Sequence, residues 1–385
     1  MKTRRAVLLA GGAAILAAGG AGYAFFLRPL VEAPAAEVGF TLTPEELAAA
    51  QAFMARHPIV DAHAHPGRTF LDGARNLSPP LLLYRWLGGR FPERTIADMR
   101  AGHVDAAVFN GVADVQLLTL GDGGLRARRD FRPGEAWASY RRQIAALKAL
   151  ETRGLVTICR SAADVRAAKK AGKIGMILAM EGADFLEGDI TRLEQVFADG
   201  VRMLTLVHYH DNTLGDIMTG SGDRRGLTDF GREVVAAMNR LGIMIDLAHA
   251  SERMVWDVLA VTAKPVVLTH THVNTQELSH PRFVSARLAK AVAESGGYIG
   301  AWPAGIGETS LREFADRIDF LVRLLGVEHV AIGSDMDANL RPVLETYRKM
   351  PLLVGALRRH GYDEAALAAV MGGNVLRVME ETQRI

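Results

Sequence analysis

Five residues with metal-binding side chains follow short apolar runs that are far apart in the sequence. They are His63, His65, Glu181, His249 and His270. Imidazole and carboxylate donors without thiolates favour zinc, with manganese, iron or cobalt as substitutes. Any one of the histidines could be a hydrogen-bonded structural residue, but a carboxylate after an apolar run is costly without a partner or a metal ion. Together the five residues predict a metal centre.

The donor set also indicates a type of reaction. Five ligands that include a carboxylate able to bridge predict two Zn²⁺ ions about 3.5–4 Å apart. A hydroxide that bridges them would be a nucleophile near neutral pH, because metal binding lowers the pKa of water to about 7. Hydrolysis of an amide or ester follows from this chemistry. His208 and Asp335 end two further apolar runs, which makes them candidates for substrate contact or proton transfer.

The elements that must position these residues are eight apolar, β-branched runs that alternate with amphipathic helical segments. Eight parallel strands close a (β/α)8 TIM barrel, in which the carboxyl ends of all strands meet at one mouth. An open doubly wound sheet is the alternative, but it usually has a glycine-rich loop after its first strand, where this chain has His63-Ala64-His65. We therefore predict a barrel, with strands at Ile59–His63, Asp105–Asn110, Ile174–Glu181, Arg202–His208, Ile243–His249, Pro265–His270, Tyr298–Trp302 and His329–Ser334.

The first 36 residues have the composition of a targeting segment and are kept apart from the barrel. Thr3-Arg4-Arg5 precedes an apolar run over residues 6–27 and resembles a twin-arginine export signal. Cleavage after Ala33-Pro34-Ala35 would fit a small-x-small site, but the run is also long enough to span a bilayer. We expect export to the periplasm, with cleavage or retention as an inner-membrane anchor as the alternatives, and one hydrolase domain over residues 37–385.

Charge and cysteine content narrow the class of protein further. The formal net charge of +2 is concentrated in the N-terminal segment, so the remainder is close to neutral and has no basic stripe. This distribution argues against a nucleic-acid partner. Cys159 is the only cysteine, which excludes an intrachain disulfide, and its apolar surroundings predict a buried thiol.

The candidate ligands belong to longer motifs that resemble the membrane dipeptidase family, also called renal dipeptidases, of the amidohydrolase superfamily. The resemblance runs from about residue 58 to 381. Its most specific part is Met238-Asn239-Arg240-Leu241-Gly242 followed by Ile245-Asp246-Leu247-Ala248-His249. The other matching segments are Met180-Glu181-Gly182, residues 201–208, residues 227–233, His280-Pro281-Arg282, residues 332–337 and residues 372–378.

The resemblance implies a zinc-dependent dipeptidase with two metal ions per chain. His63, residue 65 and Glu181 would hold the first zinc ion. Glu181 would bridge to the second zinc ion, which His249 and His270 would also hold. Family members are often homodimers, although no separate feature of this sequence indicates an interface.

The resemblance also implies roles for three residues that bind no metal. His208 would contact the scissile carbonyl and its oxyanion. Asp335 would handle protons near the bridging water and the substrate amine. Arg282 would pair with the terminal carboxylate of a dipeptide, for which a planar guanidinium is well suited.

The chain departs from the family pattern at two places. Family members typically have His-x-Asp at the end of the first strand, whereas this chain has His63-Ala64-His65. The exchange removes a negative charge from the first metal site, and we hypothesise that Asp335 is drawn closer to a metal ion in compensation. After Arg282 the chain continues Phe283-Val284-Ser285 in place of the usual Asn-Val, which concerns substrate preference more than catalysis.

Three functions are compatible with these residues. The first is a dipeptidase, with Arg282 holding the substrate carboxylate. The second is a related amidohydrolase that acts on another small amide, lactam or ester. The third is a metal-binding relative that has lost turnover through the changed ligand at His65, although imidazole remains a competent ligand.

Overall fold

The computed structural model describes residues 34–384, apart from residues 122–123 and 222–223. The predicted export signal or anchor lies outside the described residues. Within the described part of the chain, no helix is long and apolar enough to cross a membrane.

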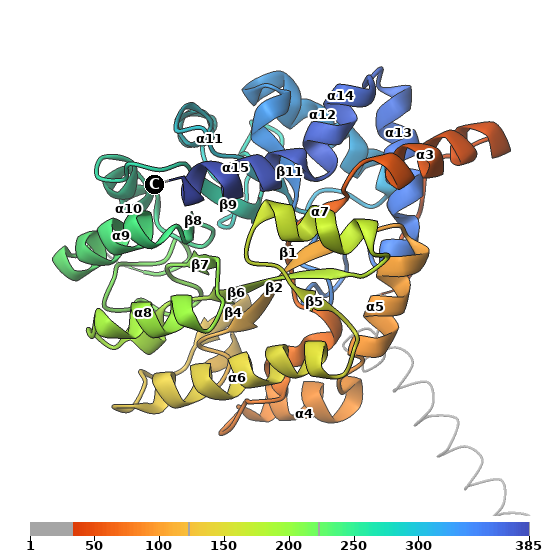
Figure 1. Ribbon diagram of the computed structural model, residues 1–385. Coiled ribbons are helices and arrows are strands. Elements are labelled where there is room, and N and C mark those ends of the chain that lie inside the picture. Colours follow the sequence, from red (N-terminus) through yellow and green to blue (C-terminus); the bar gives the residue numbers. More distant parts are fainter. Residues whose placement is uncertain (1–33, 122–123, 222–223, 385) are drawn as a thin grey trace, which may run out of the picture.

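Eight parallel strands form the wall of a nearly closed barrel (Figure 1). Their order around the wall is β1-β2-β6-β7-β8-β9-β10-β11. The first and last strands meet just beyond their carboxyl ends, where Ala64 forms a parallel bridge with Met336. The predicted TIM barrel is confirmed, with strands β1 (Val60–Ala64), β2 (Ala106–Val112), β6 (Gly175–Glu181), β7 (Met203–Thr205), β8 (Met244–Asp246), β9 (Val266–Thr271), β10 (Ile299–Ala301) and β11 (Val330–Ile332).

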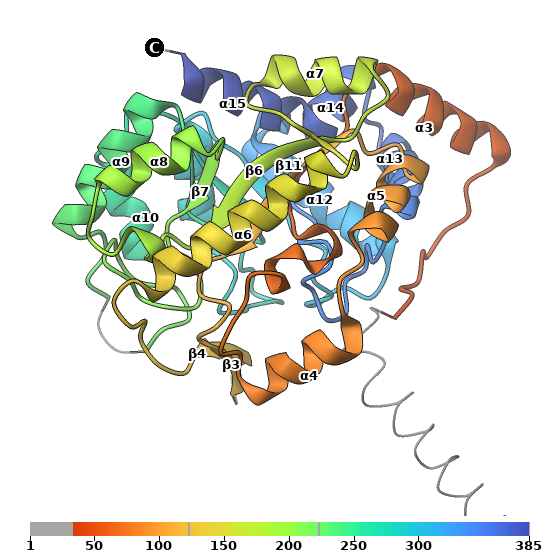
Figure 2. The ribbon, with the colours of Figure 1, turned by 60° about the horizontal axis from the view of Figure 1, so that its bottom comes forward.

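Helices surround this wall in both views of the ribbon (Figures 1 and 2). The last helix contacts β8 and β11, so the C-terminal segment covers part of the barrel. The helices are α3 (Pro44–Arg56), α4 (Pro79–Gly88), α5 (Pro92–Ala101), α6 (Glu135–Thr152), α7 (Ala162–Lys170), α8 (Thr191–Ala198), α9 (Asp229–Leu241), α10 (Glu252–Leu259), α11 (Ala286–Glu294), α12 (Leu311–Leu325), α13 (Met350–Arg359), α14 (Glu364–Ala368) and α15 (Asn374–Gln383).

Local sequence explains where the clearest helices begin and end. Thr43 and Glu46 form a capping box at the start of α3, each side chain accepting a hydrogen bond from the other residue's backbone N–H. The Thr228 hydroxyl accepts from the Gly231 N–H at the start of α9. Gly242 ends α9 with a φ of 72°, a conformation that glycine adopts without steric cost.

Several elements of the structure have no counterpart in the predicted strands. The short strand β5 (Thr157–Ile158) pairs with the start of β6. An antiparallel hairpin, β3 (Leu118–Gly121) with β4 (Gly124–Ala127), is inserted after β2. Short helical turns complete the chain: η2 (Pro66–Leu71), η3 (Asp184–Leu186), η4 (Val327–His329), η5 (Tyr347–Lys349) and η6 (Ala369–Gly373).

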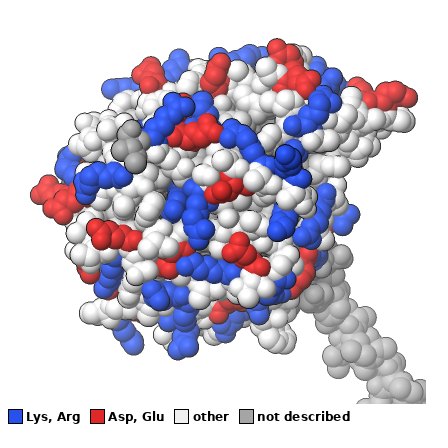
Figure 3. All heavy atoms as spheres, viewed as in Figure 1, with Lys and Arg blue, Asp and Glu red and all other residues white. Residues whose placement is uncertain are grey.

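The surface contains both signs of charge. On the face that includes α7 and α15, basic and acidic side chains are interspersed (Figure 3). Cys159 is fully buried, as its apolar surroundings predict.

Candidate metal centre and active site

Glu181 lies at the centre of a group of imidazoles at the carboxyl end of β6. Its Oε1 is 3.0 Å from Nε2 of His249, 3.5 Å from Nε2 of His270 and 3.6 Å from Nε2 of His63. Its Oε2 is 3.4 Å from Nε2 of His65. All five side chains are buried. The barrel thus brings together the five predicted ligands from four different strands.

The donor atoms form overlapping groups that suit more than one metal ion. One group is His63, His65 and Asp335, a second is His63, Glu181 and His270, and a third is Glu181, His208 and His249. Within each group all donor atoms lie within 4.8 Å of one another. Glu181 belongs to two of these groups, as expected for a carboxylate that lies between two metal sites.

The chemistry of the imidazoles fits a bound cation. The Nε2 atoms of His249 and His270 are 3.1 Å apart, and those of His63 and His65 are 3.3 Å apart. Burial and the nearby Arg282 lower the pKa of His249 well below its ordinary value, and burial with neighbouring His63 lowers that of His270. Both rings are therefore neutral and offer a lone pair, which is the form that binds a metal ion.

His65 lies between two carboxylates. Its Nε2 is 3.4 Å from Glu181 and 3.3 Å from Oδ1 of Asp335. Burial lowers the pKa of His65, but hydrogen bonds to Asp335 and Glu181 outweigh it and raise the pKa to about 10. A proton and a metal ion therefore compete for this nitrogen. The Nδ1 atom lies 3.1 Å from the Asn110 carbonyl, which fixes the ring with Nε2 toward the centre.

The hydroxyl of Thr269 connects two of the histidines to a buried carboxylate beneath them. Its oxygen is 2.9 Å from Nδ1 of His63, 3.1 Å from Nδ1 of His270 and 2.7 Å from Oδ2 of Asp246. Asp246 also accepts hydrogen bonds from the Thr205 hydroxyl and from the N–H groups of residues 248 and 269.

These contacts determine the tautomer of both rings. With four donors on its carboxylate, Asp246 acts only as an acceptor, so Thr269 donates its single hydrogen there. The hydroxyl then accepts from the Nδ1–H of His63 and of His270. Both Nε2 lone pairs are thereby directed toward Glu181, as second-sphere hydrogen bonds typically arrange for metal-binding histidines.

His208 is held by a separate carboxylate. Its Nδ1 is 2.6 Å from Oδ1 of Asp114, whose other oxygen accepts from the Tyr209 N–H at 3.0 Å. Its Nε2 lies 3.3 Å from Oε2 of Glu181. Burial lowers the pKa of His208, but Asp114 and Glu181 outweigh it, so the pKa is raised. The ring is oriented to present Nε2 to the centre.

Two site residues have unusual backbone conformations. His249 has a φ of 68° and Asp335 a φ of 51°, in the left-handed region that non-glycine residues seldom occupy. The Asp335 N–H donates to the His63 carbonyl at 2.8 Å, and the Met218 N–H donates to the His249 carbonyl at 2.7 Å. Such conformations persist where surrounding contacts hold them, and they cluster at functional sites.

Arg282 is a buried cation beside the metal-binding group. Its Nη2 is 3.0 Å from Nε2 of His249 and 3.1 Å from Nε2 of His270. Its guanidinium carbon lies 5.3 Å from the ring centre of Trp302. No carboxylate among the described residues forms an ion pair with Arg282, and its Nε has no hydrogen-bond partner there. The site thus includes a cation able to receive an anionic group.

The residues predicted from sequence therefore lie in one place, together with others that the sequence did not reveal. His210 and His272 flank the site and contact carboxylates: His210 Nδ1 is 2.6 Å from Asp184, and His272 Nε2 is 3.8 Å from Glu308. The supporting residues that went unrecognised are Asp114, Thr205, Asp246, Thr269 and Tyr209. Asp246 and Thr269 stand within three residues of a predicted ligand, and Asp246 also lies in the most specific family motif, so these sequence features could have suggested them.

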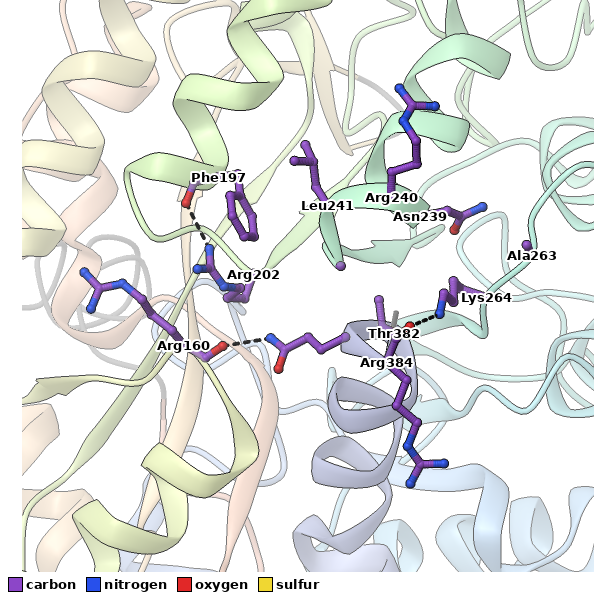
Figure 4. Close-up of a pocket in the computed structure, with 12 residues that line it drawn as sticks. Arg160, Phe197, Arg202, Asn239, Arg240, Leu241, Ala263, Lys264, Thr382 and Arg384 are labelled. Carbon is purple, nitrogen blue, oxygen red and sulfur yellow. Dashed lines mark hydrogen bonds between the residues drawn. The ribbon is translucent and has the colours of Figure 1, made fainter.

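A cavity of about 820 Å³ lies at the opposite end of the barrel (Figure 4). Its lining includes Arg160, Arg240 and Arg384, whose guanidinium groups point away from one another in the close-up. Arg202 bonds to the Phe197 carbonyl. Because active sites of such barrels lie at the carboxyl ends of the strands, this cavity is separate from the metal-binding group.

A TIM barrel with buried imidazoles and a carboxylate at its mouth defines a class of metal-dependent hydrolases. Comparison with known proteins gives the family: the membrane dipeptidase family (peptidase family M19) matches residues 47–385. The chain belongs to this family and is a metallo-dipeptidase, which acts on small peptide substrates and uses a divalent metal ion. The resemblance noted in the motifs is thereby confirmed.

Individual relatives agree with this assignment. The chain is 32% identical over 234 residues to an uncharacterized dipeptidase of Schizosaccharomyces pombe, covering 57% of this chain and 56% of the relative. A metallopeptidase of Rhodobacter sphaeroides, solved with a phosphinate mimic of the dipeptide L-Ala-D-Ala, is 26% identical with a TM-score of 0.70 and covers 85% of this chain and 99% of its own. A probable dipeptidase of Pseudomonas aeruginosa, 19% identical, shares the fold with a TM-score of 0.73 over 89% of this chain and 99% of its own.

Proposed function

We propose that the chain is a two-zinc dipeptidase that hydrolyses the single peptide bond of a dipeptide. The observation that carries the proposal is the central position of Glu181, whose Oε1 faces His63, His249 and His270 while its Oε2 faces His65. His63, His65 and Glu181 would hold one ion, and Glu181, His249 and His270 the other. Two bound zinc ions would supply a nucleophile derived from water and would polarise the scissile carbonyl.

The chain's own residues would bind and orient the substrate. Arg282 would receive the terminal carboxylate, because it is a buried guanidinium without an acidic partner among the described residues. His208, fixed by Asp114, would direct its Nε2–H at the carbonyl oxygen as negative charge develops there. The phosphinate mimic of L-Ala-D-Ala bound to the Rhodobacter sphaeroides relative supports a dipeptide as the substrate class.

Asp335 would hold a proton near the substrate amine. Its Oδ2 accepts a hydrogen bond from Trp302 Nε1 at 3.3 Å, which leaves Oδ1 toward His65. The 3.3 Å distance to His65 also supports the hypothesis that Asp335 compensates for the charge lost when His65 replaces the family aspartate.

A panel of L,L-dipeptides, L,D-dipeptides and N-blocked dipeptides tests the proposal with wild-type protein, Arg282→Lys and Arg282→Ala. We expect free dipeptides to be hydrolysed and the kcat/KM of Arg282→Ala to fall by about 100-fold, because a buried charge-assisted contact is lost. Arg282→Lys keeps the charge but loses the planar fork, so an intermediate loss is expected.

Two results would overturn this function. Hydrolysis of other amides, lactams or esters alone, unaffected by Arg282→Ala, would indicate the related amidohydrolase. Full metal occupancy without hydrolysis of any dipeptide would indicate a metal-binding relative without turnover.

A further inference from the structure

The exposed hydrophobic side chains of the described residues are concentrated on two neighbouring elements. Of the large hydrophobics exposed there, all except Val261 and Leu340 lie on α4 or on the β3–β4 hairpin. Those on α4 and the hairpin, which we name the rim patch, are Leu82, Leu83, Trp86, Leu120 and Leu125. Trp86 is 80% exposed. Clustering of this kind marks an interaction surface more often than scattered exposure does.

The inner side of the rim patch packs against the fold. On its inner side, Leu81 and Tyr84 of α4 pack against a cluster of buried hydrophobic residues that includes Phe70 and Val115. The Tyr84 hydroxyl donates to the Asp337 carbonyl at 3.3 Å. Because this face of α4 already meets the fold, its outer leucines and Trp86 face away from the core. The helix contains no fully buried residue.

The charge around the rim patch is positive. The sequence from residue 72 to 94 contains Arg75, Arg85, Arg90 and Arg94 against Asp72 and Glu93, and Asp72 pairs with Arg90, so a net positive charge remains. Arg85 and Arg128 donate to backbone carbonyls, at 3.2 Å and 2.8 Å. Apolar side chains with tryptophan, flanked by arginines, are typical of helices that lie in the headgroup region of a membrane and contact anionic lipids.

The start of the described chain lies near α5, the helix that follows α4. The Ala36 carbonyl accepts from Lys349, and the neighbouring Arg348 pairs with Asp98 of α5. If residues 6–27 stay in the bilayer as an anchor, the eight residues 28–35 separate Ala36 from it, a span of about 30 Å when fully extended. The reach of this linker matters only with the proposed anchor, whereas the exposed hydrophobic side chains and the arginines do not depend on it.

We propose that the rim patch lies against the surface of a bilayer containing anionic phospholipids, with Trp86 in the headgroup region. The elements that carry it follow β1 and β2 at their carboxyl ends, the same end of the barrel as the metal-binding group. The contact places the mouth of the active site beside the membrane surface.

Tryptophan quenching in vesicles tests the contact with the full chain. The protein is reconstituted into vesicles of phosphatidylcholine and phosphatidylglycerol with brominated acyl chains, which quench only nearby indoles. We expect quenching of the wild-type protein, loss of most of it in Trp86→Phe, and retention of it in the matched control Trp256→Phe. Weaker quenching is expected in vesicles of phosphatidylcholine alone, because the arginines then lack anionic partners.

Other outcomes would overturn the proposal. Quenching that is unchanged in Trp86→Phe would place the rim patch away from the bilayer. A full chain that does not float with the vesicles would exclude both the anchor and the contact. A dimer in detergent that Leu82→Ser dissociates, with no lipid quenching, would assign the rim patch to a second copy of the chain. None of these readouts depends on dipeptide hydrolysis.

Discussion

At the scale of single residues, the site depends on hydrogen bonds to the Nδ1 atoms of four of its histidines, whereas Nδ1 of His249 has no partner among the described residues. The Thr269 hydroxyl contacts Nδ1 of His63 and of His270. The Asn110 carbonyl contacts Nδ1 of His65, and Asp114 contacts Nδ1 of His208. The ligands themselves were predictable because each ends an apolar run. Thr269 was not, because a threonine in a strand is ordinary and nothing in its spacing indicates two imidazole partners.

Replacing Thr269 tests the role of its hydroxyl. We expect Thr269→Val to weaken zinc binding by about 10- to 100-fold, because His63 and His270 lose the acceptor for their Nδ1–H groups. Thr269→Ser keeps the hydroxyl and should bind nearly as tightly as wild-type protein. Competition with a chromophoric chelator measures both affinities without reference to activity. Equal affinities for valine and serine variants would contradict the role.

At the scale of elements, parallel strands explain why distant residues could be grouped from sequence. Every strand of the barrel delivers its carboxyl end to one mouth, so residues after the strands become neighbours. All eight predicted strands are present, although β7, β8, β10 and β11 are shorter than predicted at both ends. The β3–β4 hairpin was missed because an insertion into a βα loop follows no rule of the barrel.

An ion pair at the start of α6 gives a prediction about pH. Arg129 forms two hydrogen bonds with Glu135, both at 2.7 Å, and they lower the pKa of Glu135 to about 2. A folded-state pKa below the unfolded value of about 4.3 stabilises the fold above that pH, and the contribution is lost as the pH falls toward 2. Glu135→Gln should therefore be less stable than wild-type protein at pH 7, with the difference shrinking below pH 4.5. Chemical unfolding measured across this range checks it, and a difference independent of pH would contradict it.

At the scale of the whole molecule, the barrel holds the metal-binding residues at one end and has a separate cavity at the other. The family and the barrel could be predicted from motifs and strand number. The identity and number of metal ions, and the part played by His65, depend on distances of a few tenths of an ångström that no motif encodes. The central claim to test is therefore that the site binds two zinc ions and that His65 is a ligand of one of them.

Anomalous diffraction at the zinc edge, on crystals of zinc-loaded protein, tests this claim most directly. We predict two peaks about 3.5–4 Å apart, on either side of Glu181. His63 and His65 should coordinate one ion, and His249 and His270 the other. A single peak, or two peaks with His65 turned away from both, would contradict the account.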